Sequence, residues 1–112
     1  LERLMLNYVS SIFIDDVIDI CIKTMSKMLN TKKNFCNFYN IGTGKETSID
    51  ELTYKLSSLL KKKIKTKKTK LPLGDPKKSL GGVKKINNFL KLEKNFFTSF
   101  EKGLMKTILS YE

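Results

Sequence analysis

The fold of this chain is decided by residues 38–51, which have the sequence Phe-Tyr-Asn-Ile-Gly-Thr-Gly-Lys-Glu-Thr-Ser-Ile-Asp-Glu. The run 38–41 is apolar and rich in aromatic residues, which is typical of a short buried strand. Gly42 and Gly44 follow it and allow the backbone a positive φ without steric cost. The stretch therefore predicts a buried strand that ends in a glycine turn.

A helix start follows this turn. Ser48 and Glu51 form a capping box, in which the serine oxygen accepts a helix-start N–H and the glutamate reaches back to the amide of Ser48. The apolar spacing after it predicts a helix that buries one face. That face consists of Ile49, Leu52, Leu56, Leu59 and Leu60.

The glycines and lysine at 42–45 do not make a phosphate-binding loop. A Walker loop has a glycine five residues before its Gly-Lys pair and a Ser or Thr directly after the lysine, where this chain has Tyr39 and Glu46. The three-glycine dinucleotide fingerprint is also missing. The sequence contains no histidine, which excludes a histidine general base or triad. The sequence alone therefore shows no active site.

The amino-terminal part predicts a strand and a long helix. Residues 11–14 are a strand candidate, and Asp15 or Asp16 is expected to cap the helix that follows, where a negative charge suits the positive helix end. Apolar residues recur at helical spacing over residues 17–29. Cys21 lies on this apolar face and is predicted to be a small buried residue.

The carboxy-terminal part predicts a loop and two shorter helices. Residues 71–79 are rich in Pro, Gly and Asp and are typical of a loop. Val83 to Leu90 predicts a short helix. Thr98 with Glu101 predicts a second capping box, which starts a last helix ending near Tyr111.

The charge of the chain leaves two interpretations open. The net charge is +11, but only Arg3 among the 22 basic residues is an arginine, the side chain that forks onto phosphate and base edges. Seven of the lysines lie within residues 61–70. We interpret this run as a solvated connector and edge strand, with Ile64 as its apolar contact. The alternative is a small basic protein that binds nucleic acid through residues 61–70.

Length and composition predict one domain, residues 1–112, in the cytoplasm. The chain has no signal-peptide pattern and no apolar run of about 18 residues. Two cysteines and no histidine do not suit a zinc site, although a lone disulfide between Cys21 and Cys36 stays open. The chain begins at Leu1 without a methionine, so we expect it to be part of a longer protein.

Four segments, in order, resemble the NAD-dependent epimerase/dehydratase family of extended short-chain dehydrogenases, which act on nucleotide-sugars. Residues 12–19 are similar to the family segment F-I-Y-V-D-D-V-V, and residues 38–51 to Y-N-I-G-T-G-K-E-T-S-I-x-E-L. Residues 74–79 resemble the loop G-D-P-x-x-S. Residues 99–111 resemble the closing helix S-F-E-E-G-L-x-x-T-I-x-W-Y. The match covers almost the whole chain.

This resemblance implies an α/β fold class, with the chain as the carboxy-terminal, substrate-binding lobe of a Rossmann-type enzyme. Short strands with three to four helices are expected, without a complete Rossmann domain. NAD(P) and the catalytic Tyr-x-x-x-Lys pair belong to an upstream Rossmann portion, and no tyrosine here has a lysine four residues later. We therefore expect no catalytic and no cofactor-binding residue in this chain. The intact enzyme is expected to be a homodimer.

The resemblance also implies where the nucleotide-sugar would contact this chain. The loop at 74–79 and its neighbouring lysines are the candidate substrate-binding residues, with no metal ligand expected. They are Lys70, Asp75, Lys77 and Lys78. Val9 and Pro72 stand where the family usually has arginines that grip the diphosphate. An inactive, truncated remnant of such an enzyme is therefore a further alternative.

Overall fold

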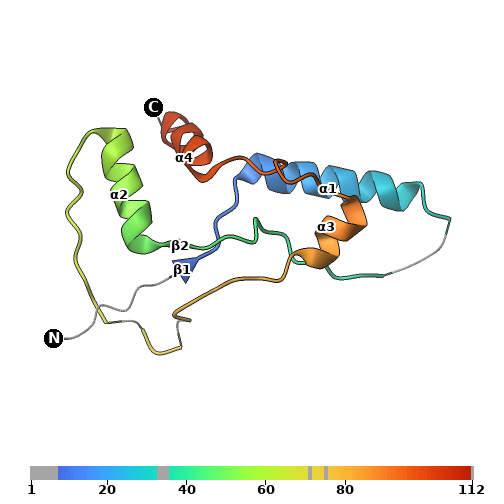
Figure 1. The fold of residues 1–112 in the computed structure, drawn as a ribbon, viewed down its shortest axis with the longest axis horizontal. Helices are drawn as coiled ribbons and strands as arrows, with labels where there is room; N and C mark the ends of the chain where they lie inside the picture. Colours follow the sequence, from blue (N-terminus) through green and yellow to red (C-terminus); the bar gives the residue numbers. More distant parts are fainter. Residues whose placement is uncertain (1–7, 33–35, 71, 75, 112) are drawn as a thin grey trace.

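The computed structural model describes residues 8–32, 36–70, 72–74 and 76–111. This part of the chain forms four helices and two short strands (Figure 1). In chain order they are β1 (Tyr8–Val9), α1 (Ile14–Leu29), β2 (Thr47–Ser48), α2 (Ile49–Leu60), α3 (Lys84–Leu90) and α4 (Phe100–Leu109). The strands β1 and β2 pair antiparallel, with Tyr8 opposite Ser48 and Val9 opposite Thr47. The described residues are thus mostly helical and contain no Rossmann sheet.

The helices form two pairs, with the small sheet between them (Figure 1). Helix α1 packs against α3 at one end, and α2 packs against α4 at the other. The chain measures 58 × 35 × 22 Å and has a radius of gyration of 17.5 Å. A compact domain of this length would have a radius of gyration of about 13 Å. The molecule is therefore elongated, and most of its apolar side chains keep some exposure to solvent.

The core of the described part is correspondingly small. Ile20 of α1 is 0% exposed and Ile86 of α3 is 1% exposed, and they are the two fully buried apolar side chains among the described residues. Beside them Lys27 of α1 lies over the ring of Phe89 in α3, 4.7 Å from its centroid. The two fully buried apolar side chains of the described part thus lie in α1 and α3, which pack against each other.

Helix α2 begins where the sequence predicts. The Oγ of Ser48 accepts a hydrogen bond from the Glu51 N–H at 3.1 Å, which satisfies one of the orphan amides of the helix start. The helix ends at Lys61, whose left-handed backbone (φ 50°) turns the chain away. The predicted apolar face of α2 is only half-buried, and its residues Ile49 and Leu60 are exposed.

The start of α1 differs from the prediction. No strand forms at 11–14, and the helix begins at Ile14, so that both predicted capping aspartates lie inside its first turn. Asp16 is buried, and its two carboxylate oxygens accept hydrogen bonds from the backbone N–H and the hydroxyl of Thr98, each at 2.8 Å. The predicted cap is wrong because this carboxylate binds a distant segment instead of its own helix.

The same contact shifts the start of α4 by one residue. Thr98 was the predicted cap, but its N–H and hydroxyl are both engaged by Asp16. The Oγ of Ser99 caps the helix instead, by accepting a hydrogen bond from the Lys102 N–H at 3.3 Å. The short helix predicted from residue 83 is confirmed as α3.

The run 38–41 does not form the predicted buried strand. Phe38 is 85% exposed, whereas the ring of Tyr39 stacks on that of Phe89 with centroids 5.0 Å apart. The strand of this region falls at residues 47–48 instead, because β1 supplies a hydrogen-bonding partner there. A positive φ is found at Gly44 (70°), as the glycine turn requires.

Two further predictions concern the cysteines and the membrane. Cys21 and Cys36 are both free and both exposed, so the prediction that Cys21 is buried is wrong. None of the helices in the described part of the chain is both long enough and apolar enough to cross a membrane.

Candidate functional site

The predicted substrate loop is anchored beside the small sheet. The Tyr8 N–H donates to the carbonyl of Lys77 at 3.1 Å, and the Ser79 N–H donates to the carbonyl of Tyr8 at 3.2 Å. Lys78 thereby forms a parallel bridge with Tyr8, on the side of β1 away from β2. Residues 77–79 therefore extend the β1–β2 pair as a third short extended segment.

The structure separates the four predicted contact residues. Lys78 forms an ion pair with Glu46, with 3.0 Å between its Nζ and Oε2. Lys77 and Lys70 are exposed, and within the described part of the chain no ion pair engages either. Asp75 lies outside the described residues. The loop therefore offers one neutralised lysine and two solvent-facing ones.

Glu46 lies beside the predicted substrate loop, a position that the sequence did not indicate. Its side chain is 20% exposed; Oε2 binds Lys78, while Oε1 is buried and has no hydrogen-bond partner. An unpaired carboxylate oxygen away from water costs free energy, so Glu46 holds Lys78 at the expense of a partly unsatisfied group. This carboxylate competes directly with any anion for Lys78.

Glu46 also lines an open cleft of about 620 Å³ between the turn at 43–47, α2, α4 and the segment before α4. Its charged lining residues are three lysines and three glutamates, so the cleft has no net charge of its own. They are Lys45, Glu46, Glu51, Lys55, Lys94 and Glu101. The sequence did not indicate this cleft because its walls come from segments far apart in the chain.

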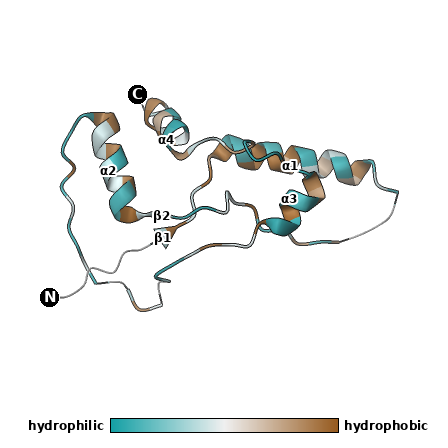
Figure 2. Cartoon of the chain, in the orientation of Figure 1, coloured by the Kyte–Doolittle hydropathy of each residue, from teal (hydrophilic) through white to brown (hydrophobic). Residues whose placement is uncertain are grey.

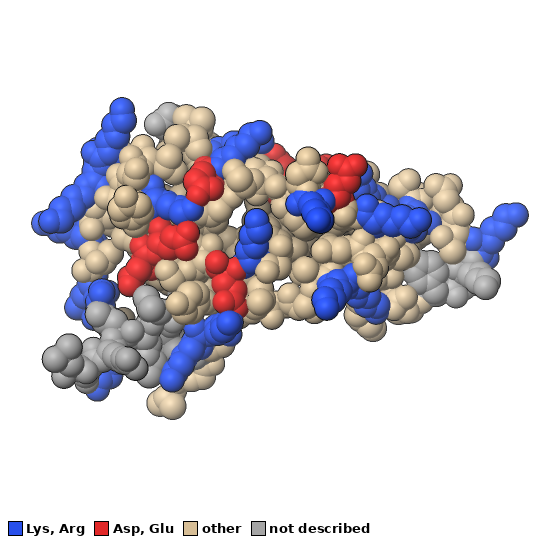
Figure 3. Space-filling view, in the orientation of Figure 1, with Lys and Arg blue, Asp and Glu red and all other residues tan. Residues whose placement is uncertain are grey.

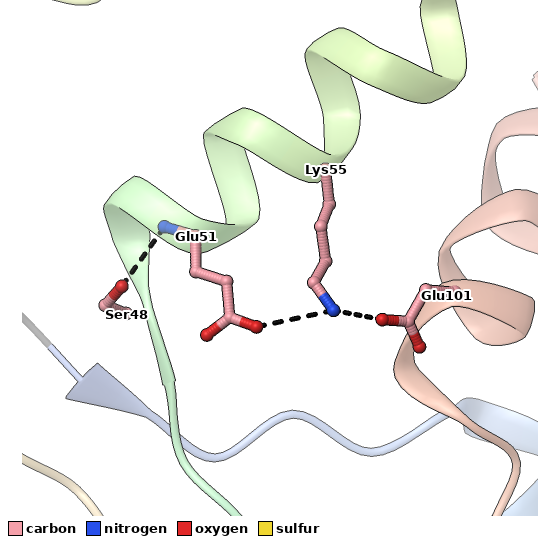
Figure 4. Close-up of polar contacts among 4 residues, drawn as sticks. All are labelled: Ser48, Glu51, Lys55 and Glu101. Atoms are coloured by element: carbon pink, nitrogen blue, oxygen red, sulfur yellow. Dashed lines mark hydrogen bonds and ion pairs between the residues drawn. The ribbon is translucent and has the colours of Figure 1, made fainter.

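Across the cleft, Lys55 links α2 to α4 (Figure 4). Its ammonium group lies 3.3 Å from Glu51 Oε1, on its own helix, and forms a second ion pair and hydrogen bond with Glu101 of α4. The ring of Phe100 lies beneath it, with 5.2 Å from Nζ to the centroid. Two carboxylates and one aromatic ring, each of which attracts a positive charge, thus surround the ammonium group of Lys55.

These contacts decide the chemistry that Lys55 can perform. The hydrogen bond to Glu101, followed by the one to Glu51, raises the pKa of Lys55 above its usual value of 10.5. A lysine acts as a nucleophile or base only when its pKa is lowered. Lys55 is therefore a fixed positive charge that holds two helices together.

The opposite shift on Glu101 gives a prediction about pH. The hydrogen bond from Lys55 is the main cause that lowers the pKa of Glu101 from 4.5. A lowered carboxylate pKa stabilises the folded chain above the unfolded pKa, and this contribution is lost as the pH falls through the folded pKa. In the Lys55→Met variant we expect the pKa of Glu101 to rise toward 4.5, measured from the carboxyl ¹³C shift by NMR.

Lys45→Met is the matched control for this titration, because the charge of Lys45 is the weakest of the causes that act on Glu101. It removes the same charge and should move the pKa of Glu101 much less. Equal effects of the two variants would mean that the contact between Lys55 and Glu101 does not persist in solution.

Within the described residues, no cluster of three Cys, Asp or Glu side chains is arranged to hold a metal ion. Comparison of the chain with protein-family models, with curated proteins and with solved structures found no match. The fold and the site therefore define a small, mostly helical unit with a charge-balanced cleft and a lysine-bearing loop beside it.

Proposed function

We propose that this chain is the substrate-side portion of an NAD(P)-dependent nucleotide-sugar epimerase or dehydratase. In such an enzyme the chain contributes contacts to the nucleotide-sugar, through the lysines of the loop around residues 74–79. NAD(P) and the hydride chemistry belong to an upstream Rossmann portion. No catalytic step is assigned to the residues of this chain.

The observation that carries the proposal is that the four segments resembling the family meet in space. Phe13, from the first segment, contacts the last one, since a Cβ on Gly103 would come within 3.3 Å of it, and Asp16 binds Thr98, the residue directly before that segment. Glu46, in the second segment, binds Lys78 of the third. The cleft joins these two pairs of contacts, because residues of the first, second and last segments line it together.

A second observation supports the presence of an upstream Rossmann portion that packs against this chain. Helix α1 carries hydrophobic and hydrophilic residues along its whole length (Figure 2). Ile20 is buried on one side of it, and a row of large apolar residues on the opposite side is exposed. This outer face of α1 consists of Ile14, Ile18, Ile22, Met25 and Leu29. Leu29 is 83% exposed and Met25 is 62% exposed. A helix that is apolar on two sides is typical of a helix buried between two layers.

The width of this face favours contact with a broad surface, such as a globular core, over contact with a single helix. With Cys21 and Met28, which flank it, the outer face covers about 120° of the helix at 3.6 residues per turn. A two-helix coiled coil uses a narrower seam, whereas a stripe wider than about 100° is typical of a helix on a globular core. We assign the outer face of α1 to contact with the sheet of the upstream Rossmann portion.

Calorimetry with nucleotide-sugars and with NAD tests the proposal. We expect weak nucleotide-sugar binding by this chain alone, with a Kd on the order of 1 mM, about −4 kcal/mol. The lysines act as point charges without the fork of an arginine, and Glu46 already neutralises Lys78. The Glu46→Gln variant should therefore bind the diphosphate roughly 2–5-fold more tightly, the equivalent of an exposed ion pair of about 0.2–1 kcal/mol.

Asp50→Asn is the matched control, since it removes one exposed carboxylate outside the loop and the cleft. Tighter binding in both variants would reflect net charge instead of the pair between Glu46 and Lys78. Micromolar binding of NAD by this chain alone would contradict an upstream cofactor site. The intact mass of the native product is a second check, because the proposal requires that it exceed 12.9 kDa.

A further inference from the structure

The positive charge of this chain is concentrated in one part of the sequence. Residues 52–92 contain 13 of the 22 basic residues and one of the 11 acidic residues. The rest of the chain contains nine basic and ten acidic residues and is nearly neutral. The net charge of +11 is therefore a property of one region and not of the composition as a whole.

The densest part of this region is residues 61–70, which we call the basic arm. It contains seven lysines: Lys61, Lys62, Lys63, Lys65, Lys67, Lys68 and Lys70. Beyond the last turn of α2, residues 63–70 form neither helix nor strand, so the predicted edge strand is not present. All residues of the arm except Ile64 are exposed. Lysine side chains gather at this left-hand end of the molecule in Figure 3.

Among the described residues, no acidic side chain forms an ion pair with a lysine of the basic arm. The ion pairs among the described residues engage Lys55, Lys78 and Lys106, and none of them engages a lysine of the arm. Lysines that hold the fold elsewhere bind a carboxylate, as Lys55 does, or a carbonyl and an aromatic ring, as Lys85 does with Phe38 and Tyr39. Within the described part of the chain, the ammonium groups of the arm are therefore exposed and hold no ion pair of the fold.

We propose that the basic arm binds the phosphate backbone of a nucleic-acid duplex without selecting a sequence. Eight extended residues span about 26 Å at 3.3 Å per residue. A duplex carries one phosphate about every 1.7 Å along its axis, so several lysines can each meet a phosphate over this length. Lysines act there as point charges, and the arm contains no arginine to make a bidentate contact with a base edge.

Two features of the arm select a duplex from other anionic partners. A protein that binds single strands stacks bases on aromatic side chains, and the arm contains none. An amphipathic membrane-binding segment inserts an apolar face, whereas the only apolar residue of the arm, Ile64, is half-buried. Binding to an anionic lipid surface by charge alone is separated from duplex binding by the vesicle experiment below. The arm offers charge alone, which is what a duplex backbone requires.

Fluorescence anisotropy of a labelled duplex of mixed sequence, about 30 base pairs long, tests this proposal over a range of salt concentrations. Four to seven phosphate contacts predict that log K falls with log salt at a slope of about −4 to −6. In the variant with Lys63, Lys65, Lys67 and Lys68 changed to Gln, the slope should become shallower by about 3–4. Lys70 stays unchanged because it is also a candidate nucleotide-sugar contact.

The matched control removes the same charge elsewhere, by changing Lys23, Lys32, Lys94 and Lys102 to Gln. All four are exposed and lie outside residues 52–92. This control should change the slope by less than about 1. An equal loss in both variants would overturn the proposal, because net charge alone would then explain binding. So would the absence of duplex binding at low salt, or binding to phosphatidylserine vesicles without binding to the duplex.

Discussion

Replacing Ile20 with alanine is expected to lower the free energy of unfolding of this chain by about 2–5 kcal/mol. Ile20 is 0% exposed and belongs to α1, which packs against α3, where Ile86 is the other fully buried apolar side chain of the described residues. The substitution removes buried methyl groups and leaves a cavity that the neighbouring side chains fill only in part. Small domains have a total stability of about 5–15 kcal/mol, so this loss is large. Urea unfolding followed by circular dichroism measures it.

Ile22→Ala is the control for this experiment, because it makes the same chemical change on the same helix. Ile22 is 59% exposed and belongs to the outer face of α1. A substitution at such a surface position should change the stability by no more than about 0.5 kcal/mol. Similar losses at both positions would show that the outer face is already covered in solution, contrary to the structure.

The second large effect is expected for Asp16→Ala. This carboxylate is 5% exposed and accepts two hydrogen bonds from Thr98, which tie the first turn of α1 to the segment that leads into α4. Its removal leaves the Thr98 N–H without a partner and should cost about 1.5–3 kcal/mol, the range for a hydrogen bond to a charged group. Urea unfolding measures the loss, and hydrogen exchange at the Thr98 amide should become faster.

Asp19→Ala separates this contact from the general effect of a negative charge on α1. Asp19 is exposed and lies on the same helix, and no hydrogen bond of its side chain is found among the described residues. Its loss should leave exchange at Thr98 unchanged. Faster exchange in both variants would attribute the effect to the helix charge and not to the buried contact.

Local signals in the sequence predicted the parts of the fold that depend on neighbouring residues. Ser48 caps α2 because the cap is formed within four residues and needs no other part of the chain. The short helix α3 likewise follows from the spacing of its apolar residues. Their positions follow from signals within a few residues of the chain, even though packing, as at Ile86 of α3, still stabilises them.

The errors occur where a distant residue competes with a local one. Thr98 was predicted as a cap, but Asp16, 82 residues away, binds its N–H and hydroxyl and leaves the cap to Ser99. Cys21 was predicted to be buried because periodicity places it on an apolar face. Helix α1 has two such faces, and the described chain covers only the one that contains Ile20.

The candidate site was predictable only in part. The lysines of the loop were identified, but the pairing of Lys78 with Glu46 joins residues 32 positions apart, and no local pattern indicates it. The same holds for Lys55 and Glu101, which come from two helices. The capping box predicted a carboxylate of Glu51 that reaches back to the Ser48 amide, whereas the contact found for this carboxylate is with Lys55.

The exposed outer face of α1 is also expected to affect how long this chain persists in the cell. A row of exposed isoleucine, methionine and leucine side chains is typical of surfaces that chaperones bind and that promote the aggregation of newly synthesised chains. Chaperones and proteases continuously remove chains whose apolar surface stays uncovered. We therefore expect this chain, when it is produced without a segment that covers the outer face of α1, to be short-lived in the cell.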